Sequence, residues 1–166
     1  MDDRWFGLGD RGRYPARVNM SVEFVKLQLR TDCDDETYVE TPWAIPSGKN
    51  QYKLENMPFY AYDLSLHDIV EAVPQDEGFP LVTRVVAKSG NKTLRIIFNG
   101  EVGKSKKTET ILDDLEEFGC EFECASPTYV VVTIPSNSDF DRITNHLTDN
   151  DLKWEYGDPS SKTLFG

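Results

Sequence analysis

Hydrophobic and polar residues repeat with two different periods in the second half of the chain, and their order predicts the fold. Short apolar or alternating runs typical of strands are TLRIIF (93–98), CEFECAS (120–126), TYVVVTIP (128–135) and LKWEY (152–156). Helical spacing instead marks KKTETILDDLEEFG (106–119) and SDFDRITNHLTDN (138–150). The order strand, helix, strand, strand, helix, strand predicts the split βαβ, or ferredoxin-like, plan with an antiparallel sheet and both helices on one face.

Two finer features of this half follow from the same patterns. Thr108 is the expected N-cap of the first helix, and Ser138 is the expected N-cap of the second. The run TYVVVTIP is apolar on both faces, so we expect it to be central and buried. We expect the closing strand, LKWEY, to lie beside the CEFECAS strand.

The first half of the chain has the two-residue period of strands. In SVEFVKLQLR (21–30), the residues Val25, Leu27 and Leu29 form the more apolar face of a strand. Further short strands, separated by turn residues, are expected within 38–46, which Pro46 should end, and within 51–65, 66–74 and 80–89. This rhythm of short strands predicts a small barrel or a strongly bent sheet.

The predicted class is therefore α+β, with two parts in series. A flexible arm at 1–20 precedes a small β-barrel-like domain at 21–90. A ferredoxin-like domain at 91–158 follows, with a tail at 159–166. The two parts should share a boundary near Gly90 and pack against each other.

Charge narrows the partners that the chain can have. The 166 residues carry a formal net charge of -11, and 39% of them are hydrophobic, enough for a packed core. Such an acidic protein repels phosphate backbones, so we expect no direct nucleic-acid binding and an attraction to basic partners. No run reaches the ~18 apolar residues of a membrane helix, and the first residues lack a signal-peptide pattern, which predicts a cytoplasmic protein.

The spacing of the cysteines and histidines predicts neither a disulfide nor a metal site. Cys120 and Cys124 lie four residues apart on a predicted strand, which separates their Cα atoms by ~13 Å, too far for a disulfide. Cys33 lies alone in an acidic run, so we expect three thiols. His67 and His146 are isolated, and no C-x-x-C pair exists, so we expect neither a metal nor a cofactor.

Three stretches together resemble a known family. They are ETPWAIP (40–46), ENMPFYAYDLSLHDIVEA (55–72) and TRVVAKSGNKTLRIIF (83–98), and their order and spacing are kept over roughly residues 22–157. They are similar to a widespread bacterial domain family of unknown function. The resemblance implies a bacterial, intracellular accessory protein, with toxin immunity as one use, and it implies no catalytic residues.

The motif closest to a nucleotide site is the loop NGEVGKSKK (99–107). It contains Gly103, Lys104 and Ser105 between a strand and a helix, where a phosphate-binding loop belongs. Phe98 occupies the position of the first required glycine, and TYVVVTIP does not end in the acidic residue that such proteins need. The simpler interpretation is a basic connecting loop, and we expect no functional nucleotide binding there.

An aromatic and polar group suggests a pocket as an alternative site. His67 and Asp68 are a possible base and carboxylate, with Trp43, Tyr60 and Tyr62 as lining residues. Because adjacent residues on a strand point in opposite directions, His67 and Asp68 should not form a dyad with each other. The simpler interpretation is a half-buried loop with aromatic packing.

Two acidic clusters are the candidate partner-binding residues. One is Asp32, Asp34, Asp35 and Glu36; the other, on the exposed side of the first helix, is Asp113, Asp114, Glu116 and Glu117. Solvated surface is the usual explanation of such runs. The functional interpretation is an interface with a basic protein, and we favour the helix cluster because a helix holds its charges in a fixed geometry.

Three functions therefore remain open. The first, which the lack of a catalytic motif favours, is a non-enzymatic immunity protein that binds and blocks a basic toxin. The second is an enzyme or small-molecule-binding accessory protein with a pocket between the two parts. The third is a structural subunit of a larger assembly.

Overall fold

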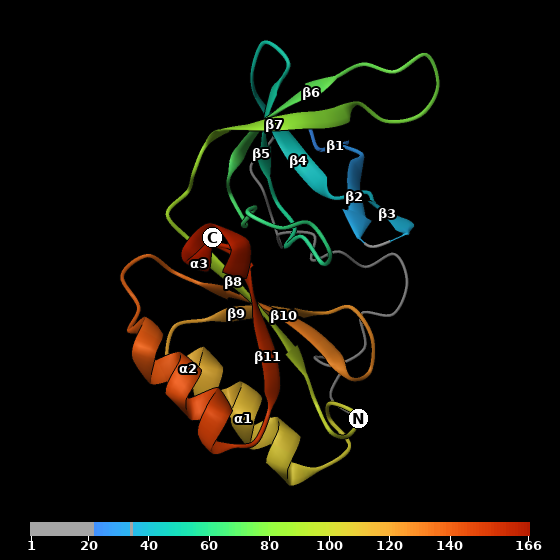
Figure 1. Cartoon of the computed structure of the whole chain (residues 1–166). Helices are drawn as coiled ribbons and strands as arrows, with labels where there is room; N and C mark the ends of the chain where they lie inside the picture. The colour runs from blue at the N-terminus through green and yellow to red at the C-terminus, as the bar shows by residue number, and fades with distance from the viewer. Residues whose placement is uncertain (1–21, 34) are drawn as a thin grey trace.

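The computed structural model describes residues 22–33 and 35–166, so the predicted arm at 1–20 lies outside the described residues. The strands of the first half are β1 (Val25–Lys26), β2 (Leu29–Cys33), β3 (Glu36–Glu40), β4 (Trp43–Gly48), β5 (Gln51–Leu54), β6 (Ile69–Val73) and β7 (Leu81–Ala87). The second half contains β8 (Lys92–Ile97), α1 (Lys106–Glu117), β9 (Glu121–Cys124), β10 (Tyr129–Ile134), α2 (Phe140–Asp149), β11 (Lys153–Asp158) and α3 (Ser161–Phe165). The protein is thus mostly antiparallel sheet with a few helices (Figure 1).

The first half is an open sheet, so of the two predicted forms the closed barrel is not found and the bent sheet remains. Strands β1, β4, β5, β6 and β7 form an antiparallel sheet in that order, and β2 and β3 form a separate hairpin. Within the described residues no closed ladder forms, although one isolated parallel bridge between Gln28 and Leu81 links the chain after β1 to the edge strand β7. Register shifts in the β4–β5 and β6–β7 pairs bend the sheet, because a bulge increases strand twist.

Two of the predicted strands are divided. The strand expected at 21–30 becomes β1 and the start of β2, although Leu27 and Leu29 are buried as predicted. The strand expected at 38–46 becomes β3 and β4, and β4 continues through Pro46 to Gly48. A proline is tolerated there because β1 pairs with only Trp43 and Ala44, which leaves the rest of β4 without a ladder on that side.

The second half is a four-stranded antiparallel sheet in the order β11-β8-β10-β9. The prediction that β10 is central and buried is confirmed, whereas the placement of LKWEY beside CEFECAS is wrong, because β11 pairs with β8. The reason is the handedness of crossovers. Strand β10 runs antiparallel to β8, and α2 lies on the same face of the sheet as α1. A right-handed crossover from β10 through α2 therefore moves across the sheet in the opposite direction to the crossover from β8 through α1, and it places β11 on the far side of β8.

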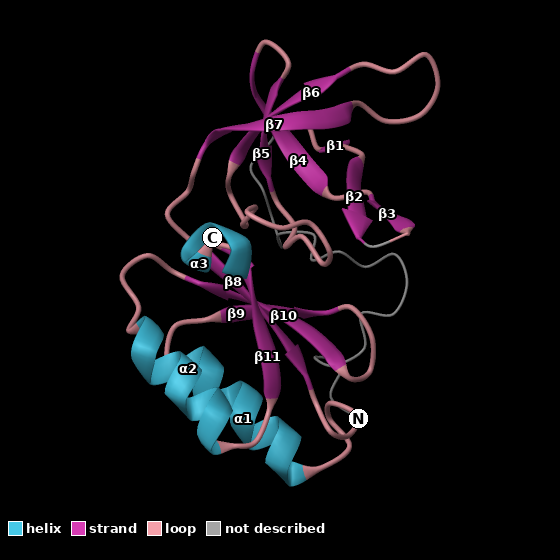
Figure 2. Ribbon diagram, in the orientation of Figure 1, coloured by secondary structure: helices cyan, strands magenta, loops and turns pink. Residues whose placement is uncertain are grey.

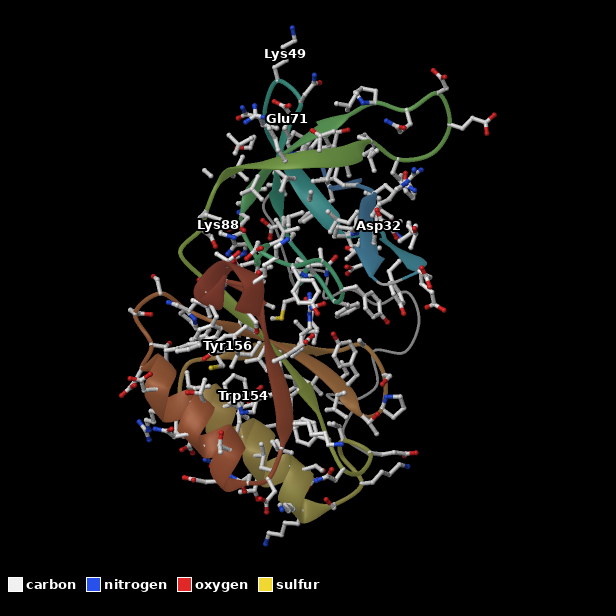
Figure 3. The ribbon with its side chains drawn as sticks, in the orientation of Figure 1. Asp32, Lys49, Glu71, Lys88, Trp154 and Tyr156 are labelled. Atoms are coloured by element: carbon white, nitrogen blue, oxygen red, sulfur yellow. The ribbon has the colours of Figure 1, made fainter. Side chains whose placement is uncertain are left out.

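Helices α1 and α2 cover one face of this sheet (Figure 2). The core between them contains three residues of α1, two of α2 and the facing side chains of β8 and β10: Ile111, Leu112, Leu115, Ile143, Leu147, Leu94, Ile96, Val130, Val132 and Ile134. Trp154 and Tyr156 of β11 pack against the same core (Figure 3). No helix of the described residues is long and apolar enough to cross a membrane.

Both predicted helix starts are corrected. The N-cap of α1 is Ser105, whose side chain accepts from the Thr108 backbone N–H, so the helix begins before the expected Thr108. The N-cap of α2 is Asp139, one residue after the expected Ser138, and it accepts from the Arg142 N–H. Serine, threonine and aspartate are all good caps, so composition alone does not select among neighbouring candidates.

The opposite face of the second sheet carries the first half of the chain. Met57 and Leu66, from the long connection between β5 and β6, are buried against Val131 of β10. Phe59 and Tyr129 flank this small apolar cluster. In Figure 1 the connection lies between the two sheets.

Candidate binding surface

The first acidic cluster lies on the β2–β3 hairpin, and its side chains have hydroxyl partners. Asp32, Asp35 and Glu36 are exposed, and Asp34 lies outside the described residues. Thr37 Oγ1 donates to Asp32 Oδ1 at 2.7 Å, and the Tyr38 hydroxyl donates to Glu36 Oε2 at 2.8 Å. Figure 3 shows Asp32 on this hairpin. The carboxylates of Asp32 and Glu36 are thus held on a paired hairpin by their neighbours.

The second acidic cluster lies on α1 and has basic neighbours on α2. Asp113, Glu116 and Glu117 are exposed, whereas Asp114 is half-buried with its Oδ2 atom 3.2 Å from His146 Nε2. The Arg142 guanidinium lies over the ring of Phe118, the residue that ends α1, at 4.1 Å from the ring centre. Of these two α2 residues, Arg142 carries a permanent positive charge, and it lies at the C-terminal end of α1.

Tyrosines gather where the hairpin meets the second sheet. The rings of Tyr38 and Tyr60 stack with their centres 4.9 Å apart, and the Tyr129 ring centre lies 6.1 Å from that of Tyr60. Nearby, the Arg95 guanidinium lies 4.3 Å from the centre of the Tyr62 ring. Tyr38, Tyr60 and Tyr62 are 36%, 39% and 43% exposed. We call Tyr38, Tyr60, Tyr62 and Tyr129 the tyrosine surface.

Glu40 fixes the loop that presents Tyr60. Its carboxylate accepts hydrogen bonds from three consecutive backbone N–H groups, those of Phe59, Tyr60 and Ala61, at 2.6, 2.8 and 3.0 Å. Consecutive N–H groups that converge in this way form an anion-binding concavity, which is filled here by the protein's own carboxylate. The Tyr129 hydroxyl also donates to the Phe59 carbonyl at 2.6 Å, so the loop is held from two sides.

The environment of Tyr129 keeps its hydroxyl protonated. Burial raises the pKa of this hydroxyl, and the opposing effect of the Arg95 charge is smaller. The neighbouring Glu155 and Glu40 carboxylates also raise the pKa, since they disfavour a second negative charge. Tyr129 therefore acts here as a hydrogen-bond donor.

The residues expected to line a pocket make their contacts with different partners. The Trp43 ring lies under Lys26 Nζ, 4.9 Å from the ring centre, and His67 Nε2 is 3.8 Å from Glu55 Oε2 on the protein surface. His67 has a positive φ of 68°, a conformation that turns it away from its neighbour in the chain. Tyr60 and Tyr62 belong instead to the tyrosine surface, and Asp68 belongs to the polar network described next.

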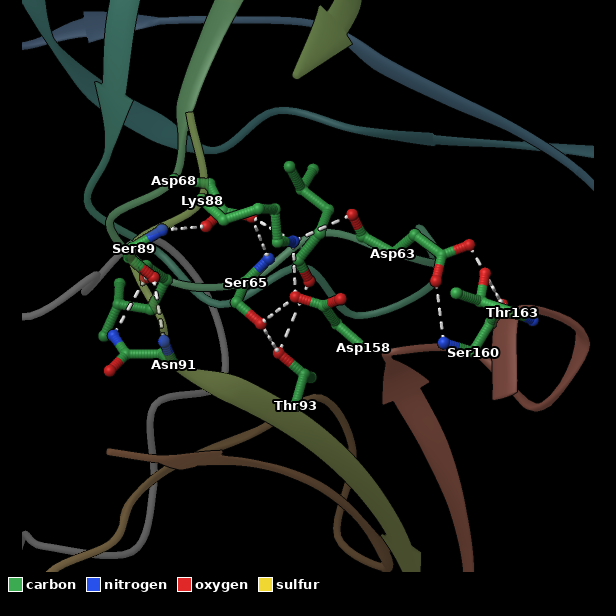
Figure 4. A network of polar contacts seen from close by, with 12 residues as sticks. Asp63, Ser65, Asp68, Lys88, Ser89, Asn91, Thr93, Asp158, Ser160 and Thr163 are labelled. Carbon is green, nitrogen blue, oxygen red and sulfur yellow. Dashed lines mark hydrogen bonds and ion pairs between the residues drawn. The ribbon is translucent and has the colours of Figure 1, made fainter. Parts of the chain in front are cut away.

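Asp68 is part of a buried polar network that joins the two halves (Figure 4). Lys88 Nζ lies 2.6 Å from Asp68 Oδ2 and 2.5 Å from Asp158 Oδ2. Ser65 Oγ donates to Asp158 at 2.6 Å and lies 2.7 Å from Thr93 Oγ1. Asp68 and Asp158 are 0% and 5% exposed. We call these five residues the polar junction.

The polar junction stabilises the charged form of the Lys88 side chain. Burial lowers the pKa of the Lys88 ammonium, but hydrogen bonds and charge from Asp158 and Asp68 outweigh it, so the pKa is raised. A catalytic lysine needs the opposite shift, because only the neutral amine is nucleophilic. Ser65 is completely buried, so its hydroxyl has no access to a substrate. The network links the two halves rather than presenting a reactive group.

Asp63 extends this linkage to the end of the chain. It accepts from Ser160 N at 2.7 Å and from Ser160 Oγ at 2.9 Å, next to the start of α3 (Figure 4). Burial raises the pKa of Asp63, but the hydrogen bonds from Ser160 and Thr163 and the charge of Lys88 outweigh burial, so the pKa is lowered. The residues predicted as a tail therefore include a short helix tied to the first half.

The remaining candidates have structural partners as well. Ser105 of the GKS sequence caps α1, as described above. Burial raises the pKa of the Cys120 thiol to about 11, and burial with the Glu123 charge raises that of Cys124, which disfavours thiolate chemistry. Within residues 22–33 and 35–166, no three His, Cys, Asp or Glu side chains gather as a metal site. Whether the GKS loop binds nucleotide stays a prediction.

Sequence reasoning missed Glu40, Lys88 and Asp158, which organise two polar groups in the described structure. Their partners lie far away in the chain, at separations of 19 to 21 residues for Glu40 and 70 residues for the Lys88–Asp158 pair. The resemblance did include Glu40 and Lys88 within its stretches, but it assigned no role to either residue.

Comparison with known proteins supports the fold and leaves the activity open. A family model described as a domain of unknown function, DUF4265, matches residues 40–156. A crystal structure of a hypothetical protein from Neisseria gonorrhoeae is similar, with a TM-score of 0.70 and 18% sequence identity, and the match covers 81% of this chain and 94% of that chain. At this identity the likeness concerns the fold alone. No curated protein matches the chain.

Proposed function

The chain belongs to the DUF4265 family, a domain of unknown function, and we propose that it is a non-enzymatic protein-binding module for a basic protein. In the most specific form of the proposal, it is a bacterial cytoplasmic immunity protein that blocks a cognate toxin by steric occlusion and electrostatic complementarity. The pocket-bearing enzyme or small-molecule binder is the less supported function, because Asp68 is already paired with Lys88.

One observation carries the proposal, the contrast between buried and exposed carboxylates. The buried pair, Asp68 and Asp158, shares the single ammonium of Lys88. The carboxylates of the two clusters face solvent and supply much of the net charge of -11: Asp32, Asp35, Glu36, Asp113, Glu116 and Glu117. Exposed charge of one sign steers a partner of opposite charge, and that effect is what an inhibitor of a basic protein requires.

The proposal includes a finer interpretation of the fold. We infer that 91–158 is a ferredoxin-like unit and that 21–90 is a β-rich unit packed on its open sheet face. The strand order β11-β8-β10-β9, with α1 and α2 on one face, supports this division. The Met57, Leu66 and Val131 cluster and the polar junction would then be the interface between the units.

The test uses the whole chain and its protein partner. A tagged chain is used to capture proteins from a bacterial lysate, and the candidate partner is then purified and expressed with and without this chain. We expect the partner to arrest growth alone and to be harmless in the presence of this chain. We also expect its association rate to fall about tenfold or more between ~0.05 M and ~0.5 M NaCl, because salt screens exposed charges.

Two outcomes would contradict the proposal. A purified partner that binds equally fast at both salt concentrations, and tolerates neutralisation of both acidic clusters, would mean that the acidity serves solubility only. A partner that binds but whose activity is unchanged would exclude the immunity form of the function.

A further inference from the structure

We propose that the tyrosine surface, together with the adjacent Asp35 and Glu36 of the β2–β3 hairpin, is the site that receives the basic partner, and that an arginine-bearing segment of the partner stacks there. This inference rests on the proposed function and names its site. It selects the hairpin cluster over the helix cluster that the sequence favoured.

The first argument is the aromatic area that the surface exposes. Tyr38, Tyr60 and Tyr62 are more than one-third exposed, and Ile97, the cross-strand partner of Tyr129, is 51% exposed. Exposed aromatic rings that gather in one place are typical anchors of protein interfaces, since tyrosine buries a large area with little loss of side-chain entropy. The rings come from β3, the β5–β6 connection and β10, and Ile97 comes from β8, so the surface exists only in the folded chain.

The second argument is preorganisation. The loop that carries Tyr60 is held by the three N–H bonds to Glu40 and by the hydroxyl bond of Tyr129. The Tyr38 and Tyr60 rings are nearly parallel, at 23°, so one face of the stack is already formed. A partner would therefore bind without first ordering these side chains, and this lowers the entropy cost of association.

The third argument is charge complementarity. Glu36 accepts from the Tyr38 hydroxyl, so a carboxylate adjoins the rings, whereas Glu155, 3.2 Å from the Tyr62 hydroxyl, balances the charge of Arg95. Arg95 is 3% exposed and paired with Glu155, so its charge is neutralised within the protein. Its guanidinium already stacks on Tyr62, which demonstrates the contact that a second arginine would make. Lys153, beside Ile97, is the basic group at the far edge.

The helix cluster lacks this combination of features. Of the described large hydrophobic side chains that are exposed, none belongs to α1. Its neighbour Arg142 supplies a positive charge at the C-terminal end of α1, and His146 contacts Asp114. An acidic helix face without an aromatic anchor changes the rate of encounter but contributes little to retention of a bound partner.

The test titrates nona-arginine and nona-lysine peptides into the full chain labelled with ¹³C on its tyrosine rings. The charge variants are matched: Asp35→Asn with Glu36→Gln on the hairpin, and Asp113→Asn with Glu116→Gln on α1. The ring variants are also matched: Tyr60→Ser on the tyrosine surface, and Phe79→Ser in the β6–β7 connection. Circular dichroism and a thermal melt confirm that each variant is folded.

We expect the ring signals of Tyr38 and Tyr60 to shift and nona-arginine to bind more tightly than nona-lysine, because guanidinium stacks on aromatic rings. Tyr60→Ser and the hairpin pair should each raise the Kd about tenfold, which corresponds to ~1.4 kcal/mol, while the α1 pair and Phe79→Ser change it less than about twofold. If Tyr60→Ser unfolds the chain, the hairpin pair decides the question in its place.

Unmoved tyrosine signals, or equal effects of the two charge pairs, would overturn this inference. The same variants are then compared on the purified partner of the proposed function. Salt-dependent binding that is lost only in the α1 pair would overturn the tyrosine surface and leave the proposed function standing. A partner that binds independently of salt and of both pairs would overturn the proposed function itself.

Discussion

Replacing Lys88 with methionine should destabilise the protein through the carboxylates that it leaves behind. Methionine keeps most of the apolar stem and removes the ammonium that lies 2.6 Å from Asp68 and 2.5 Å from Asp158. Both carboxylates are almost inaccessible to water, so their charges would lose a nearby cation without gaining hydration. Breaking a buried ion pair by removing one partner costs about 3–5 kcal/mol.

Two features of the structure lower the expected free-energy cost of Lys88→Met below the range for a buried ion pair. The Lys88 side chain is 44% exposed, so water already screens part of the attraction. Asp68 also keeps two backbone donors, Ser65 N and Ser89 N, and Asp158 keeps the Ser65 hydroxyl. We therefore expect Lys88→Met to lower the free energy of unfolding by about 2–3 kcal/mol at neutral pH.

The assay is urea unfolding followed by tryptophan fluorescence, with Arg84→Met as the matched control. Arg84 forms an exposed pair with Glu71, with side chains 59% and 32% accessible, so its loss should cost less than about 1 kcal/mol. The double variant Lys88→Met with Asp158→Asn should recover part of the lost stability, since it removes one of the two stranded charges.

The stability difference between the wild type and Lys88→Met should depend on pH, and the direction of that dependence can be worked out for each protein. Lys88→Met removes the ammonium, so any pH dependence that Lys88 confers on the wild type is absent from the variant. In the wild type, the Lys88 pKa lies above its ordinary 10.5, so its contribution is complete below pH 10.5 and is lost as pH rises through the raised value. Equal costs for Lys88→Met and Arg84→Met, with no dependence on pH, would refute the reasoning.

Three further predictions concern other parts of the fold. Gly157→Ala should lower the thermal midpoint by an amount equivalent to about 1–3 kcal/mol, since its Cβ would lie 3.0 Å from Thr93 Cγ2; an unchanged midpoint would contradict this. Asp63→Asn should lower the urea midpoint at neutral pH, and the difference should disappear as pH falls through the Asp63 pKa, which is below 3.8; a constant difference would exclude this linkage. In mass spectrometry near pH ~8, Cys120 should be alkylated by iodoacetamide far more slowly in the native chain than in urea, and equal rates would show that burial does not protect it.

Local periodicity in the sequence was sufficient for the secondary structure and the buried faces of the second half. Ile111, Leu112 and Leu115 repeat at helical spacing and are buried, and the apolar run of β10 is the buried central strand that its composition predicts. These predictions succeed because helix and strand periods place neighbouring residues on one face whatever the rest of the chain does. The caps moved by one to three residues because several adjacent residues satisfy the same chemistry.

Only the tertiary structure decided how the elements pair and which polar groups meet. Which strand lies beside β11 depends on the direction of a crossover, and whether the first sheet is open or closed depends on whether its edge strands pair. Neither can be predicted from a local sequence pattern. The same holds for Lys88 with Asp158, for Glu40 with the loop at 59–61, and for the stack of Tyr38 on Tyr60. Each contact joins side chains distant in the chain, where the gain from hydrogen bonding or stacking appears only after backbone packing has brought them within a few ångströms.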